Sequence, residues 1–229
     1  KVQWIGLEAV EIGYRVKAKG YAERASDWGE RVKTGPGQVV SRTVELAPGR
    51  PVAGRVVNEH EWPVAGARVE VVATYNASGF GGHYWGSSIR TTSAPDGSFV
   101  LEDLPEGRVD ILAQKEGYAL AKAPRVEVGK TDLQLVLREG ASLGGVVLNA
   151  QRQPAAGASV QIHFAQDPGG LRGRLQQRSV RSGDDGRWSF EHLEAGTYEV
   201  IAQLGQAYSE RKQNIALGWN DKRDDIELI

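Results

Sequence analysis

The most constraining feature of this sequence is that it repeats itself. Residues 54–71, GRVVNEHEWPVAGARVEV, align without a gap with residues 145–162, GVVLNAQRQPAAGASVQI, at an offset of 91. Residues 93–114, SAPDGSFVLEDLPEGRVDILAQ, align with residues 182–203, SGDDGRWSFEHLEAGTYEVIAQ, at an offset of 89. Self-similarity at a fixed period is the mark of a chain assembled from copies of one structural unit. The sequence therefore predicts two tandem domains of one fold.

A third, partial copy is predicted at the start of the chain. GYRVKAKGYAERA (13–25) followed by VELAPGRPVAG (44–54) resembles AQKEGYALAKA (113–123) followed by LVLREGASLGG (135–145). That second pair of segments forms the back half of a unit. The predicted domains are a partial preceding unit over 1–50 and complete units over 51–139 and 140–229.

The pattern inside each unit is that of β-strands. Apolar residues alternate with polar or small ones, which is the period-2 pattern of half-buried strands. Asp96-Gly97 and Asp185-Gly186 lie between short strands, where a tight turn needs positive φ. We expect all-β, tandem seven-stranded antiparallel β-sandwiches. The residues expected to point inward are Val69, Val71, Phe99, Leu101, Val109 and Ile111 in the first unit, and Val160, Ile162, Trp188, Phe190, Tyr198 and Val200 in the second.

The junctions between units are short. Residues 46–50 and 137–142 offer too few positions to act as flexible linkers. We therefore expect neighbouring units to touch and to hold a limited range of angles.

Composition excludes several classes of function. The 28 Lys and Arg residues balance 29 Asp and Glu residues, so no nucleic-acid binding is expected. No apolar run is long enough for a membrane span in this fragment. The chain has no cysteine, which excludes disulfides and thiol chemistry. It also has no methionine, so we interpret it as a piece of a longer protein, with any signal peptide upstream and out of view.

The order of residues resembles one known family. G-x-V-V-x-x-x-x-x-P-x-x-G-A-x-V, then D-G-x-F-x-x-x-x-L-x-x-G, then G-Y-A, is similar to the carboxypeptidase regulatory-like family. The resemblance implies a transthyretin-like (prealbumin-like Greek key) sandwich. Such domains occur as the non-catalytic domain behind metallocarboxypeptidases and as tandem arrays in bacterial exported proteins. It implies an extracellular, periplasmic or cell-surface location, loops that carry specificity, no enzymatic activity and no cofactor.

The sequence lacks the signatures of enzymes that share the transthyretin-like fold. Hydroxyisourate hydrolases end in Tyr-Arg-Gly-Ser, whereas this chain ends in DDIELI. Intradiol dioxygenases bind iron with closely spaced histidines, and the four histidines here, His60, His83, His163 and His192, are far apart in sequence. Collagen-adhesin B-type repeats, which look similar, often carry a Lys–Asn isopeptide bond. The first strands of the two units, GRVVN and GVVLN, contain no lysine, so this bond is not expected. We predict no catalytic residues.

The first candidate site is the segment 75–88, YNASGFGGHYWGSS, which differs from its counterpart in length and chemistry. Aromatic faces bind sugars or apolar peptides because they bury a large area with few torsions to order. Glycine allows the backbone to approach a ligand closely. The alternative is that this segment extends two strands and packs against the neighbouring unit. The predicted ligand-binding residues are Tyr75, Asn76, Phe80, His83, Tyr84, Trp85 and Arg90.

The second candidate site is the counterpart segment 167–181, DPGGLRGRLQQRSVR. Guanidinium groups pair with phosphate and carboxylate, so Arg172, Arg174, Arg178 and Arg181 are predicted to bind an anion. The alternative is a solvated hairpin. If the two segments face the same way, they would form one surface for an acidic glycan.

Two further features have structural explanations. Asp184-Asp185 and the acidic group at 220–225 could provide oxygen ligands for calcium, but Asp-Gly turns explain the first pair without a metal, and no metal site is predicted. Trp62 and Trp188 are expected in a core or an interface rather than on a ligand platform.

The sequence favours a non-catalytic tandem β-sandwich module of a larger exported or cell-surface protein, acting as spacer and protein-interaction surface. Two alternatives remain open. One is a carbohydrate-binding module that uses segment 75–88. The other is an accessory domain that docks onto an enzyme elsewhere in the parent chain. The expected partners are other domains of the parent chain, a polysaccharide or a cell-surface protein.

Overall fold

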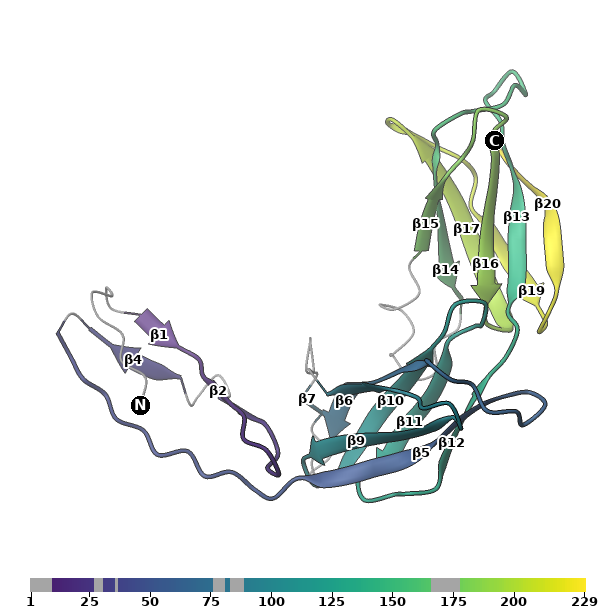
Figure 1. Ribbon diagram of the computed structural model, residues 1–229. Coiled ribbons are helices and arrows are strands. Elements are labelled where there is room, and N and C mark those ends of the chain that lie inside the picture. Colours follow the sequence, from purple (N-terminus) through teal and green to yellow (C-terminus); the bar gives the residue numbers. More distant parts are fainter. Residues whose placement is uncertain (1–9, 27–30, 36, 76–80, 83–88, 166–177) are drawn as a thin grey trace. The chain divides into compact units, whose positions relative to one another are not determined.

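The structure is a computed structural model of the 229-residue chain, and it describes residues 10–26, 31–35, 37–75, 81–82, 89–165 and 178–229. Its regular elements over these residues are β-strands (Figure 1). The predicted all-β class is therefore confirmed. The chain forms two compact units.

The first sandwich consists of two sheets. One has the strand order β12-β5-β9, and the other has the order β11-β10-β6-β7, in which β8 also pairs with β6. The strands are β5 (Arg50–Asn58), β6 (Arg68–Tyr75), β7 (Gly81–Gly82), β8 (Arg90–Thr92), β9 (Ser98–Leu104), β10 (Arg108–Gln114), β11 (Ala121–Glu127) and β12 (Leu133–Leu137).

The core of the first sandwich is built from the alternating residues of these strands. The six side chains that were predicted to point inward are all buried. Ala67, Leu104, Leu135 and Leu137 join them. Alternation along each strand places these apolar side chains on one face of a sheet, and burial against the facing sheet stabilises the pair.

The second sandwich repeats this arrangement. Its sheets have the orders β16-β13-β20 and β15-β14-β17-β18, in which β19 also pairs with β17. One contiguous core contains all six predicted inward residues of this unit. Its strands are β13 (Ala141–Val147), β14 (Ser159–Phe164), β15 (Arg178–Arg181), β16 (Arg187–Leu193), β17 (Gly196–Leu204), β18 (Ala207–Tyr208), β19 (Lys212–Leu217) and β20 (Lys222–Leu228).

One strand pair of the second sandwich departs from the antiparallel expectation. The first and last strands of the second sandwich, β13 and β20, run in parallel, with Ser142 beside Lys222. Parallel neighbours need a long crossover connection, and the rest of the unit supplies it. Gly145 permits the pairing because a Cβ at this position would overlap the carbonyl oxygen of Ile226. Gly54 of β5 has the same relation to Leu133 of β12.

Backbone conformation confirms that the two sandwiches are copies. Left-handed backbone is uncommon for residues other than glycine. Seven such residues have positive φ in the described part of the chain, and six of them form three pairs at the repeat offsets. The pairs are Glu61 with Arg152, Asp103 with His192, and Arg125 with Asn214.

A buried serine is also shared by the two units. In the second sandwich the Ser182 hydroxyl accepts from the Ala158 amide (2.9 Å) and donates to the Ala155 carbonyl (2.6 Å). Ser93 makes the same pair of hydrogen bonds in the first sandwich. The hydroxyl satisfies two backbone groups that burial removes from water, which is why a polar residue lies in this part of the core.

The described residues of the N-terminal segment form two small sheets. Strand β1 (Val10–Ile12) pairs with β4 (Val32–Thr34), and β2 (Arg15–Val16) pairs with β3 (Arg24–Ala25). Among the described residues before β5, Ala22 alone is buried. Two-stranded sheets are marginal in water without a covering layer, so the described residues of this segment do not form a core of their own.

The two tryptophans with predicted positions differ in their surroundings. Trp188 is buried in the second core and contacts Phe190 edge-on, with 5.8 Å between ring centroids. Trp62 lies after β5 and is 68% exposed. Trp62 was expected in a core or an interface, and the core position is wrong. A polar turn, in which Asn58 accepts from the Trp62 amide, holds the residue outside the core.

Candidate interaction sites

The aromatic segment begins in a polar cluster of the first sandwich. Tyr75 ends β6, and its hydroxyl donates to the Asp110 carboxylate at 2.7 Å. The other oxygen of Asp110 accepts from the Arg125 backbone amide at 2.7 Å. The Arg125 guanidinium lies over the Tyr75 ring, 3.8 Å from its centroid. The three side chains thus hold one another through a hydrogen bond, a backbone contact and a cation–π contact.

Asp110 is 3% exposed, although it carries an ionisable group. A buried carboxylate is tolerated when its oxygens accept hydrogen bonds, and both oxygens of Asp110 do so. Burial raises the pKa of Tyr75, and the hydrogen bond and negative charge of Asp110 raise it further, against an opposing effect of Arg125. The Tyr75 hydroxyl is therefore held in its neutral, donating form.

The sequence missed Asp110 and Arg125. A signal for the first exists, because an acid interrupts the apolar strand VDILA, and Glu199 interrupts YEVIA in the second unit. Glu199 pairs with Arg211 at 3.2 Å. No pattern in the sequence marks Arg125. Its role depends on a left-handed backbone, with φ of 55°, that turns its amide toward Asp110.

Arg90 is the other described member of the predicted aromatic site. It lies on β8, opposite Glu70 of β6, and is exposed. Arg90 lines an open groove of about 420 Å³ whose wall includes Lys19, Tyr21 and Glu102. The exposed ring and the charged groups give this groove hydrogen-bonding and stacking partners for a polar ligand.

The remaining predicted residues of the two segments lie outside the described residues. They are Asn76, Phe80, His83, Tyr84, Trp85, Arg172 and Arg174.

The two described arginines of the basic segment both contact backbone carbonyls of their own unit. Arg178 donates to the Glu191 carbonyl at 2.7 Å. Arg181 donates to the Gly157 carbonyl at 3.1 Å. Each guanidinium retains further N–H groups, because it carries five donors. These contacts therefore hold β15 against its neighbours and leave donors for an anion.

The acidic turns of the second unit have structural roles. Asp185 accepts from the Arg187 amide, and Asp221 accepts from the Gly218 amide at 2.6 Å. The hydrogen bond from Arg223 lowers the pKa of Asp225. Within the part of the chain that the structure describes, no three His, Cys, Asp or Glu side chains form a group that could hold a metal ion.

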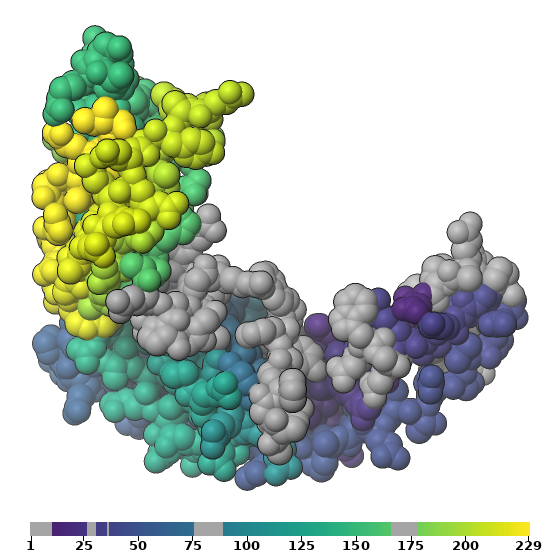
Figure 2. Space-filling view, turned by 180° about the vertical axis from the view of Figure 1, so that it is seen from behind, coloured from purple at the N-terminus to yellow at the C-terminus, as the bar shows by residue number. Residues whose placement is uncertain are grey.

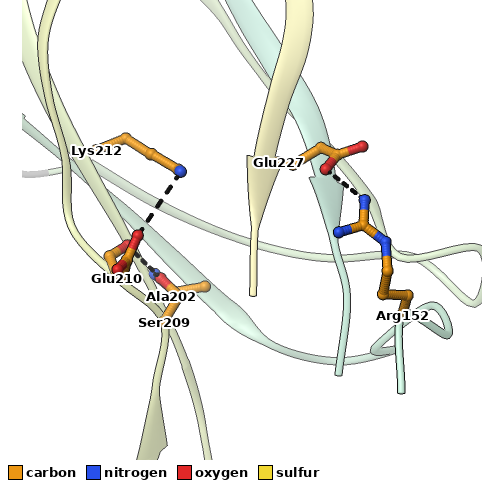
Figure 3. Close-up of polar contacts among 6 residues, drawn as sticks. All are labelled: Arg152, Ala202, Ser209, Glu210, Lys212 and Glu227. Atoms are coloured by element: carbon orange, nitrogen blue, oxygen red, sulfur yellow. Dashed lines mark hydrogen bonds and ion pairs between the residues drawn. The ribbon is translucent and has the colours of Figure 1, made fainter. Parts of the chain in front are cut away.

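Side-chain contacts brace the loops of the second sandwich (Figure 3). Arg152, in the loop after β13, pairs with Glu227 of β20 at 2.9 Å. Ser209 accepts from the Ala202 amide at 3.0 Å beside the hairpin of β17 and β18. The same hairpin projects from the unit in the space-filling view, as a yellow-green extension (Figure 2). Its exposed Tyr208 makes this tip available for contact.

The fold and its duplicated internal contacts define a tandem β-sandwich protein. No helix in the described ranges has the length and apolarity needed to cross a membrane. The profile of the carboxypeptidase regulatory-like domain matches residues 51–138 and again 142–228. The chain belongs to the carboxypeptidase regulatory-like domain family.

Several solved structures are similar to this chain at low identity. The Bacillus anthracis TIE protein is 12% identical, with 96% of this chain and 42% of that chain covered and a TM-score of 0.29. The streptococcal ancillary pilin is 14% identical, with 96% and 76% covered and a TM-score of 0.33. The shaft pilin SpaA from Lactobacillus rhamnosus GG is 12% identical, with 79% and 97% covered and a TM-score of 0.32.

Similarity at this level carries no inference about function. The chain spans less than half the length of the TIE protein. No curated protein matches the chain.

Proposed function

We propose that this chain is a non-catalytic spacer and interaction module of a larger exported or cell-surface protein. The observation that carries the proposal is the connector between β12 and β13. Three residues, 138–140, separate these strands. A connector this short has little conformational freedom compared with a flexible linker.

The connector is also anchored at its ends. The carbonyl of Arg138 accepts from the Ala119 amide at 2.9 Å. Gly140 packs against the backbone of His192 so closely that a Cβ would overlap it. Gly49, before the first sandwich, has the same relation to Asp103. Anchoring at both ends supports a stiff spacer whose segments and loops are displayed at fixed intervals.

Electron–electron distance measurements test the spacer. His60→Cys and Gln151→Cys place spin labels at equivalent exposed positions of the two units, in a chain with no native cysteine. We expect a narrow distance distribution. A matched variant with a Gly-Ser insertion after Glu139 should broaden it. A broad distribution without the insertion, equal to that with it, would contradict the stiff spacer.

A second candidate function is carbohydrate binding at the segment 75–88 and the adjoining groove. The groove beside Arg90 favours it, because an exposed aromatic ring and charged groups share one surface there. Tyr75 would hold the start of segment 75–88 in place rather than contact the ligand, since Arg125 covers its ring and Asp110 accepts from its hydroxyl.

Titration of tryptophan fluorescence with polysaccharides tests this function. We expect Tyr84→Ala and Trp85→Ala to abolish the signal change and Trp62→Ala to leave it intact. Binding that survives the first two substitutions would exclude the segment. A docking role toward an enzyme of the parent chain would appear as binding of the 229-residue chain to that enzyme domain produced separately, with no polysaccharide response.

A further inference from the structure

One backbone hydrogen bond occurs three times along the chain. In the first sandwich, the Ala119 amide donates to the Arg138 carbonyl at 2.9 Å, just after the last strand. In the second sandwich, the Glu210 amide donates to the Ile229 carbonyl at 3.3 Å, and both residues are shifted by 91 positions. The third case lies before the first sandwich, where the Ala22 amide donates to the Ala47 carbonyl at 2.9 Å.

The turn beside this hydrogen bond is repeated as well. The Tyr118 amide donates to the Lys115 carbonyl around Gly117, whose φ is 87°. Tyr21 donates to Ala18 around Gly20, whose φ is 83°. The segment before β5 therefore has the local geometry of the back half of a sandwich.

The apolar pattern of this segment matches the same part of a sandwich. Ile12, Tyr14 and Val16 lie 97 positions before Val109, Ile111 and Ala113. The three residues of β10 are fully buried, because the facing sheet covers them. Their counterparts in the N-terminal segment alternate with exposed residues but are only half-buried. This face is apolar and incompletely covered.

The counterpart of β12 in the N-terminal segment explains why this apolar face is incompletely covered. Residues 42–46 lie 91 positions before β12 and carry its apolar alternation at Val44 and Leu46. They form no strand. Strand β12 pairs with β5, the first strand of its own unit. In the described part of the chain, residues 42–46 have no counterpart of β5 to pair with.

We propose that residues 10–50 are the back half of a third sandwich, and that their apolar face binds the front half of a sandwich of the same family. The polypeptide that joins the chain at its N-terminal side supplies that front half. The front half of a complete unit is β5–β9 or β13–β16, and the back half is β10–β12 or β17–β20. In both units the front half directly precedes the back half, and residues 105–107 and 194–195 join the two halves. This proposal is independent of the spacer function.

Hydrogen exchange tests the proposal. The 229-residue chain is compared with a chain that carries its native preceding residues, to the length of residues 51–107. Covered strands exchange through unfolding, whereas uncovered ones exchange through local opening. We expect the amides of Tyr14, Val16, Val44 and Leu46 to exchange at least about 100-fold more slowly in the extended chain. Equal rates in the two chains would overturn the proposal.

A pair of substitutions separates a shared core from nonspecific ordering. In the extended chain, Leu46→Asp should return residues 10–46 to the fast rates of the 229-residue chain. The matched variant Glu45→Lys, at an exposed neighbouring position, should leave exchange slow. Equal effects of the two substitutions would contradict a shared core. If the 229-residue chain already exchanges slowly and sediments as a dimer, a second copy covers the face and the proposal is wrong.

Discussion

Replacing Ser182 by alanine should destabilise the second sandwich alone. The substitution leaves the Ala158 amide without its acceptor and removes the donor to the Ala155 carbonyl. An unsatisfied buried polar group costs about 1–3 kcal/mol, so we expect a loss of about 2–6 kcal/mol for the two groups. For a domain of this size, about 1 kcal/mol lowers Tm by about 4–8 °C. The expected shift is therefore at least about 8 °C.

Trp188 provides the assay, since it is buried in the same core. In a chain whose other five tryptophans are replaced by phenylalanine, its fluorescence reports unfolding of the second sandwich during denaturant titration. Ser179→Ala, at an exposed position of β15, is the matched control and should have little effect. Ser93→Ala should destabilise the first sandwich and leave the Trp188 transition in place. A Ser182→Ala transition within about 0.5 kcal/mol of the unsubstituted chain would refute the reasoning.

Three further outcomes follow from the contacts. Gly145→Ala should separate β13 from β20, because the new Cβ overlaps the Ile226 carbonyl. We expect a loss of about 1–3 kcal/mol in the same denaturant assay. A loss well below about 1 kcal/mol would show that the strands can move apart without cost. Because the pKa of Tyr75 is raised in the folded state, its neutral hydroxyl stabilises the fold at pH values below the ordinary tyrosine pKa of about 10. This contribution is lost as the pH rises from about 10 through the folded-state pKa. Ultraviolet titration should show Tyr75 ionising above that value, and nearer to it after Asp110→Asn; an unchanged titration would contradict the contact. Arg152→Ala should cost less than about 0.5 kcal/mol, since its ion pair with Glu227 is largely exposed, and a loss above about 1 kcal/mol would assign that pair a larger role.

The fold was predictable because its determinants are local and duplicated. Alternation identified the inward residues, such as Phe99 and Trp188, and the Asp-Gly turns identified the positive φ of Gly97 and Gly186. The parallel pairing of β13 with β20 was not predictable from alternation, because strand direction depends on how distant segments meet. Gly145 lies where the two strands approach closely, but a glycine in a strand does not identify the neighbouring strand.

The candidate sites were less predictable. Composition identified the aromatic and basic segments, yet the contacts of Tyr75 depend on Asp110 and on the left-handed backbone of Arg125. These residues are far apart in sequence and meet only when the sheet forms. Trp62 shows the same limit, because a large apolar residue suggested a core and the Asn58 turn places it outside.

The parallel pair also governs when a unit can finish folding. Strand β13 opens the second sandwich and its partner β20 closes it, with Ser142 beside Lys222. Long-range pairings of this kind are slow to form, because a large loop must close before any contact is gained. A chain that emerges gradually, from a ribosome or across a membrane, therefore cannot complete this unit until its final strand has emerged.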